Sequence, residues 1–162
     1  MDIGLISLPS SSHKGSQQFN TTHILDSSVM ICFRKDSPLA NKESLTIEDI
    51  YQYPIAIAFN NNDQKMFYSQ LLGKFSKLNT LVQSQNSETR KYFISEGLAI
   101  CFEPELTTKS DPFYQREDII VKPVLGIESK VTYSCIQLKN QNFSVAAQEF
   151  LKELIINANN FK

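Results

Sequence analysis

Few residues of this sequence have the types and spacing that catalysis requires. No carboxylate pair, Ser/His/Asp set or phosphate-cradling glycine loop appears in it, so we expect a protein that is not an enzyme. The side chains best suited to ligand chemistry are the three arginines, Arg34, Arg90 and Arg116, any of which could clamp a carboxylate with paired N–H donors. For Arg90, a solvated helix face or a surface ion pair is the simpler interpretation.

Metal and disulfide chemistry are not indicated either. His13 and His23 do not form a ligand set with cysteines or carboxylates, so neither a metal nor another cofactor is expected. Cys32, Cys101 and Cys135 lie far apart in apolar runs, and their number is odd. We therefore expect buried, reduced thiols rather than a disulfide.

The composition is that of an ordinary folded domain. The chain has 162 residues, of which 41% are hydrophobic and 20% charged, enough to bury one sizeable core or two small lobes. Its 16 basic and 17 acidic residues leave a net charge of -1 without a Lys/Arg stripe, so direct nucleic-acid binding is not expected. No apolar run approaches the roughly 20 residues of a membrane span. Asp2 stands where an export signal would be basic, and we expect a cytoplasmic protein.

Hydrophobic patterns divide the chain into alternating strands and helices. We predict strands at residues 3–8, 24–34, 54–59, 78–82, 98–102 and 131–138, and helices at 47–51, 62–76, 88–96 and 145–155. Ser87 and Ser144 are expected to cap the last two helices, and Gly97 to end the third. Residues 104–130 are predicted to be loop-rich, with one strand at 118–121. The alternation is typical of an α/β domain with a mostly parallel sheet.

This architecture indicates where a ligand would bind. In folds built from strands that are followed by helices, ligands bind at the carboxyl ends of the strands, where the helices begin. Backbone N–H groups and short polar side chains at a helix start suit a carboxylate, with about 0.3 to 1 kcal/mol from the helix dipole at exposed sites. The architecture does not by itself select a function.

An ordered series of short motifs is more specific. It comprises Asp2-Ile3-Gly4-Leu5-Ile6, Ile31-Cys32-Phe33, Ser37-Pro38-Leu39-Ala40, Leu45-Thr46-Ile47-Glu48-Asp49-Ile50, Tyr53-Pro54-Ile55, Ile94-Ser95-Glu96-Gly97-Leu98-Ala99-Ile100, Pro104, and Tyr133 ahead of Ser144-Val145-Ala146-Ala147-Gln148-Glu149-Phe150-Leu151. Over nearly the whole chain, the series closely resembles the effector-binding domain of LysR-type transcription regulators. Ser37 stands where that family often has histidine, and Leu98-Ala99 where a second glycine is usual.

The resemblance implies a periplasmic-binding-protein-like (type 2) α/β fold, with two Rossmann-like lobes joined by two crossing strands. Residues 1–27 with 138–162 would form part of the first lobe, and residues 28–137 the crossing strands and a complete second lobe. The family's winged helix-turn-helix and the first strand-helix-strand unit of its sensing domain have no counterpart in the sequence. DNA contact is therefore expected only through a segment absent from this chain. The incomplete lobe should expose apolar side chains such as Leu5, Phe150 and Leu154, which favours a homo-oligomer.

Effectors in the family are small metabolites, often anionic, held between the lobes. By resemblance, the contact residues follow the predicted strands and are Ser7, Ser10, Asn60, Asn61, Ser84, Asn86 and Ser87. Purely structural roles remain open for some of them, because Ser87 could cap a helix and Asn60-Asn61 could form a turn.

The expected function is therefore the sensing of a small effector. A solute-binding protein of the same fold is one alternative, although it would need an export signal that the sequence does not show. A truncated remnant that only oligomerises is another. Prephenate dehydratase and porphobilinogen deaminase are similar in outline, but they require catalytic Thr, Asp or cofactor-bearing Cys patterns that we do not find.

Overall fold

The computed structural model describes residues 3–9, 18–58, 79–126, 130–140 and 144–161. They belong to two compact units, of which unit 1 is Met1–Ser27 with Lys130–Lys162 and unit 2 is Ser28–Ser129. Strand β2 (Phe19–Arg34) contributes residues 19–27 to unit 1 and residues 28–34 to unit 2. Within the described ranges, no helix has the length and apolar character to cross a membrane.

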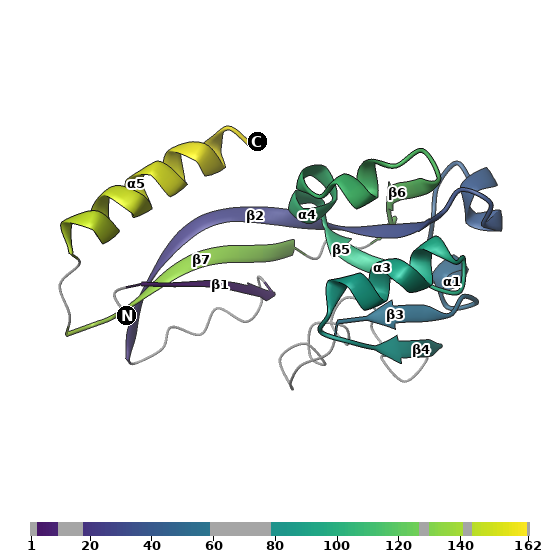
Figure 1. Ribbon diagram of the computed structural model, residues 1–162, viewed down its shortest axis with the longest axis horizontal. Helices are drawn as coiled ribbons and strands as arrows, with labels where there is room; N and C mark the ends of the chain where they lie inside the picture. The colour runs from purple at the N-terminus through teal and green to yellow at the C-terminus, as the bar shows by residue number, and fades with distance from the viewer. Residues whose placement is uncertain (1–2, 10–17, 59–78, 127–129, 141–143, 162) are drawn as a thin grey trace. The chain divides into compact units, whose positions relative to one another are not determined.

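In the part of unit 1 that the structure describes, three strands combine with one long helix. β1 (Gly4–Pro9) pairs antiparallel with β7 (Lys130–Leu138), and β7 is followed in the strand order by β2. α5 (Val145–Asn159) runs beside these strands (Figure 1). It begins as predicted, because the Ser144 side chain accepts a hydrogen bond from the Ala147 N–H at 3.2 Å. The Thr132 hydroxyl donates to Asp26 at 2.6 Å, which ties β7 to β2.

The sheet of unit 2 is mixed. β2 pairs antiparallel with β5 (Ile100–Pro104) and with β6 (Ile119–Pro123). β3 (Ile55–Ile57) pairs parallel with β5 and with β4 (Thr80–Gln83). The prediction of a mostly parallel sheet is therefore wrong for β2. Strand–helix–strand crossovers such as β4–α3–β5 keep strands parallel, and no such crossover imposes that direction on β2.

Prolines begin elements in the region that was predicted to be loop-rich. Pro104 ends β5 and caps α4 (Glu105–Ser110), and Pro112 is the first residue of the 3-10 helix η4 (Pro112–Gln115). The prediction of loops at 104–130 is thus wrong in part, because proline is tolerated in the first turn of a helix. The shorter elements η2 (Pro38–Asn41) and α1 (Ile47–Ile50) precede β3.

Helix α3 (Ser87–Ser95) packs against β3 and β5 and closes the core of unit 2 (Figure 1). The core is built from buried side chains of β2, β3, α3, β5, η4 and β6 and of the residue just before β5, namely Cys32, Ala56, Ile94, Ala99, Cys101, Tyr114 and Ile119. Cys32 lies opposite Cys101 across β2 and β5. All three cysteines are free and buried, as predicted.

Candidate effector-binding site

The turn between β4 and α3, residues 84–86, lies at the carboxyl end of parallel strands. The Ser84 N–H donates to the Ile57 carbonyl at 3.0 Å, so the turn begins beside the last residue of β3. The Ser84 hydroxyl accepts from the Asn86 N–H at 3.2 Å, and the Asn86 side chain accepts from the Glu88 N–H at 2.9 Å. Asn86 is therefore the cap of α3. The prediction that Ser87 caps it is wrong by one residue.

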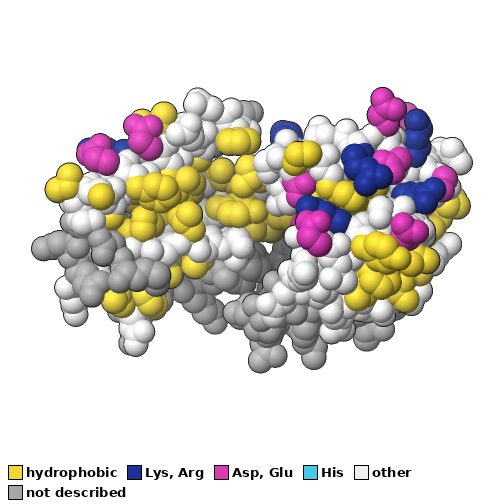
Figure 2. Space-filling model, in the orientation of Figure 1, with side chains coloured by type: hydrophobic (Ala, Val, Ile, Leu, Met, Phe, Trp, Pro, Cys, Tyr) yellow, Lys and Arg dark blue, Asp and Glu magenta, His cyan; other side chains and the backbone are white. Residues whose placement is uncertain are grey.

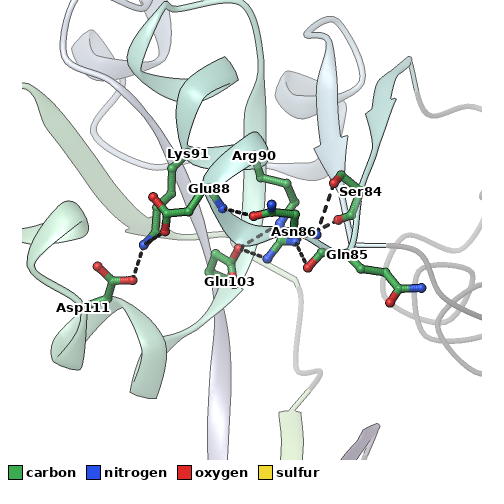
Figure 3. Close-up of polar contacts among 8 residues, drawn as sticks. All are labelled: Ser84, Gln85, Asn86, Glu88, Arg90, Lys91, Glu103 and Asp111. Atoms are coloured by element: carbon green, nitrogen blue, oxygen red, sulfur yellow. Dashed lines mark hydrogen bonds and ion pairs between the residues drawn. The ribbon is translucent and has the colours of Figure 1, made fainter.

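A buried arginine holds this turn from inside (Figure 3). Nη1 of Arg90 donates to the carbonyls of Ser84 at 2.9 Å and Gln85 at 3.4 Å. Its Nε and Nη2 donate to Oε1 of Glu103 at 3.3 and 3.0 Å. Both Arg90 and Glu103 are 7% exposed, so the interpretation of Arg90 as a solvated side chain is wrong. One guanidinium thus joins the start of α3, the turn and β5.

A second ion-pair network fixes the outer side of α3. Lys91 contacts Glu88 at 2.8 Å and Asp111 at 2.7 Å, and its ammonium lies 5.7 Å from the centre of the Phe113 ring. Asp111 and then Glu88 raise the pKa of Lys91, and Lys91 lowers the pKa of Asp111. In Figure 3, Glu88 points toward Lys91, on the side of the helix away from Ser84. The carboxylate in the first turn of α3 is therefore already neutralised.

The start of α3 keeps donors for a ligand. The backbone N–H groups of Ser87 and Thr89 have no acceptor among the residues that the structure describes. Glu88 donates to the Asn86 cap between them. Two N–H groups at a helix start, next to the Ser84 hydroxyl, form an arrangement that suits a carboxylate or phosphate oxygen.

Three of the predicted contact residues, Ser84, Asn86 and Ser87, come together in this turn. Ser7 lies in β1 of unit 1, opposite Tyr133 of β7, and is exposed. Ser10, Asn60 and Asn61 lie outside the described residues. Contact between any of these side chains and an effector stays a prediction.

Reasoning from the sequence missed the Arg90–Glu103 pair, although two signals for it were present. Arg90 lies four residues before Ile94, which is fully buried, so both side chains face the sheet. Glu103 sits in a strand with four buried residues, where a carboxylate needs a partner. Together these signals indicate a buried ion pair.

The comparisons with known proteins identify the family and the fold of the chain. The model of the LysR substrate binding domain matches residues 1–157. The structure of the effector binding domain of QuiR in complex with shikimate has a TM-score of 0.76 and 13% identity, covering 98% of this chain and 72% of that one. The regulatory domain of Synechocystis PCC6803 CcmR in complex with 2-PG has a TM-score of 0.72 and 21% identity, covering 98% and 74%. No curated protein matches the chain.

Full-length CbnR complexed with its target DNA has a TM-score of 0.71 and 12% identity, covering 98% of this chain and 52% of that one. The present chain therefore spans about half the length of a complete regulator. The predicted periplasmic-binding-protein-like (type 2) α/β fold is confirmed. The chain belongs to the LysR substrate-binding domains, the small-molecule-sensing part of LysR-type transcription regulators.

Proposed function

We propose that this domain senses a small anionic metabolite, which binds at the turn before α3. The observation that carries the proposal is the pair of N–H groups of Ser87 and Thr89 beside the Ser84 hydroxyl, at the carboxyl ends of β3 and β4. The buried Arg90–Glu103 pair holds this turn in one conformation, which lowers the entropy lost on binding. A bound shikimate in QuiR, a carboxylate, supports the ligand class.

The site would bind its ligand without turning it over, as expected for a regulator rather than an enzyme. DNA would be contacted by another part of the regulator in the cytoplasm, since the chain spans 52% of CbnR, whose full-length form was solved with DNA. We also propose that residues 28–137 form the crossing strands and the second lobe. Residues 1–27 with 138–162 would form part of the first lobe.

Thermal unfolding with a panel of amino acids, organic acids and aromatic acids, shikimate included, tests this function. An effector at 100 times its Kd should stabilise the native state by about 2.7 kcal/mol and should be recovered unchanged. The variant Ser84→Ala should weaken binding by about five- to tenfold, since it removes a hydroxyl from the turn. Ser95→Ala, at the other end of α3, is the matched control. If no compound of the panel stabilises the domain, the alternative of a remnant that only oligomerises is favoured. If Ser84→Ala and Ser95→Ala bind the effector equally tightly, the proposed site is contradicted.

We also propose that unit 1 pairs with a second copy of the chain. Its exposed apolar side chains include Leu5, Phe150, Ile156 and Phe161, each about half exposed or more. Figure 2 shows hydrophobic side chains gathered beside α5. Single exposed apolar side chains are ordinary on a monomer, whereas several of them on one unit favour an interaction surface. Leu154, also predicted to be exposed, is half-buried.

Light scattering should therefore give a mass above the 18.4 kDa of one chain. Phe150→Lys should shift the chain toward the monomer, because a buried unpaired ammonium is costly. Leu125→Lys, which changes an exposed apolar residue of unit 2, should leave the mass unchanged. A monomeric unsubstituted chain at all concentrations would contradict the pairing.

A further inference from the structure

Unit 2 contains a cavity at the opposite end of α3 from the proposed effector turn. Its volume is about 300 Å³, and it is lined by residues 33, 34 and 36–38 at and after the end of β2, 53–54 before β3 and 96–100 after α3. That size is at the small end of the range for ligand pockets. The nine residues of α3 separate cavity and turn by about 13 Å, at about 1.5 Å per residue. The cavity lies at the amino ends of β3 and β5, so it is distinct from the carboxyl-end site.

The walls of the cavity combine apolar and polar surface in about equal parts. Phe33 is fully buried behind it, and Pro38 and Pro54 line its sides. Leu98 lies at its rim, 48% exposed. Figure 2 shows hydrophobic side chains gathered over this end of unit 2. An apolar ligand body would replace water on these walls, and that replacement is favourable.

The cation in the lining is already neutralised. Nε of Arg34 donates to Oδ1 of Asp36 at 2.9 Å, and Nη2 donates to the other oxygen of the same carboxylate. Nη1 donates to the Ser95 carbonyl at 3.1 Å. The arginine lies against Gly97, whose φ is +68° and where a Cβ would stand 3.4 Å from Cδ of Arg34. An anion would have to compete with Asp36 for this guanidinium.

Glu96 adds a carboxylate to the lining of the cavity. Its side chain is exposed and, within the described ranges, has no hydrogen-bond or ion-pair partner. With Arg34 paired to Asp36, Glu96 leaves the lining with a net charge of one negative unit. The Tyr53 phenol, half-buried in the lining, also has no partner in the described part of the chain and adds an aromatic wall.

We propose that this cavity binds a small organic cation, in which an ammonium group pairs with Glu96 and a compact apolar body lies against Pro38, Pro54 and Leu98. The site is independent of the effector turn, because Ser84 and α3's first residues do not line it. The ligand class follows from one uncompensated carboxylate next to the apolar part of the lining.

Benzylammonium, benzyl alcohol and benzoate test the charge preference, because they share one apolar body. Amide chemical shifts of the full chain, followed by NMR, should titrate with benzylammonium at residues 53 and 97–99, with a Kd on the order of 1 mM. Benzyl alcohol should bind more weakly, and benzoate should bind least.

The variant Glu96→Gln should weaken benzylammonium binding by about three- to tenfold, since it removes the charge but keeps the size. Glu117→Gln, which alters an exposed carboxylate elsewhere in unit 2, should not change the Kd. The proposal is overturned if benzoate binds as tightly as benzylammonium, if Glu96→Gln leaves the Kd unchanged, or if the shifts occur elsewhere. Anionic ligands test the Ser84 turn, whereas benzylammonium tests the cavity. Failure of this proposal and failure of the proposed function are therefore distinguishable.

Discussion

Replacing Arg90 with methionine is expected to lower the free energy of unfolding by about 3 to 5 kcal/mol. The guanidinium and the Glu103 carboxylate are both 7% exposed, so loss of one leaves the other charge buried without its partner. The carbonyls of Ser84 and Gln85 lose a donor as well. Urea unfolding, followed by circular dichroism, measures the difference.

Two further variants separate the buried pair from ordinary side-chain loss. Lys152→Met removes the exposed ion pair with Glu149, whose side chains are 65% and 61% exposed, and should cost less than about 1 kcal/mol. Combining Arg90→Met with Glu103→Leu should recover much of the loss, because an apolar pair of similar volume needs no partner. A double variant that is less stable than Arg90→Met alone would contradict this account.

The same pair also bears on ligand binding. Arg90→Lys keeps the charge, but an ammonium cannot span Glu103 and the two carbonyls in the geometry of the guanidinium. The turn would then lose part of its preorganisation while Ser84 and Asn86 remain in place. Arg90 is thus a positioning residue for the proposed site.

Features set by neighbouring residues could be predicted from the sequence. Ser144 begins α5, and Gly97 ends α3 with a φ of +68°, because caps and left-handed turns depend on a few adjacent groups. The buried strands around Cys32 and Cys101 were also recognisable from their apolar runs. In each case the signal and the structure lie within a few residues of each other.

Features set by distant residues were not predictable in the same way. Glu103 is thirteen positions from Arg90, and only the packing of α3 on β5 brings them together. The direction of β2 beside β5 depends on the whole chain path. The predicted cap of α3 was wrong by one residue, because asparagine and serine have nearly equal preference for the cap position. Only the geometry of the turn determines which of Asn86 and Ser87 takes it.

Helix α5 shows both cases. Ala147, Leu151, Leu154 and Ala158 recur at helical spacing and form its buried or half-buried side. Val145 and Phe150, apolar residues of the same helix, are 76% and 49% exposed. A hydrophobic pattern identifies apolar residues but does not state what covers them, and the proposed second copy would supply that cover.

Above pH 9 the domain should lose stability steeply. Burial, and then the neighbouring Cys32 thiol, raise the pKa of Cys101 well above its ordinary 9.0. Burial, and then Cys101, raise the pKa of Tyr114 above its ordinary 10.0. A group whose pKa is raised on folding contributes its full stability below the unfolded pKa and loses it as the pH rises. Each group should cost about 1.4 kcal/mol per pH unit above its unfolded value, or roughly 4 kcal/mol together at pH 11.

Urea unfolding between pH 8 and pH 11, with and without one substitution, isolates this effect from the titration of exposed lysines. Tyr114→Phe removes the phenol while it keeps the ring packed in the core, so the variant should lose about 1.4 kcal/mol less at pH 11 than the unsubstituted chain. Tyr92→Phe, at a side chain 59% exposed, should follow the unsubstituted curve. If all three curves coincide, the Tyr114 phenol ionises as easily in the folded chain as in the unfolded one, and η4 does not bury it against the core.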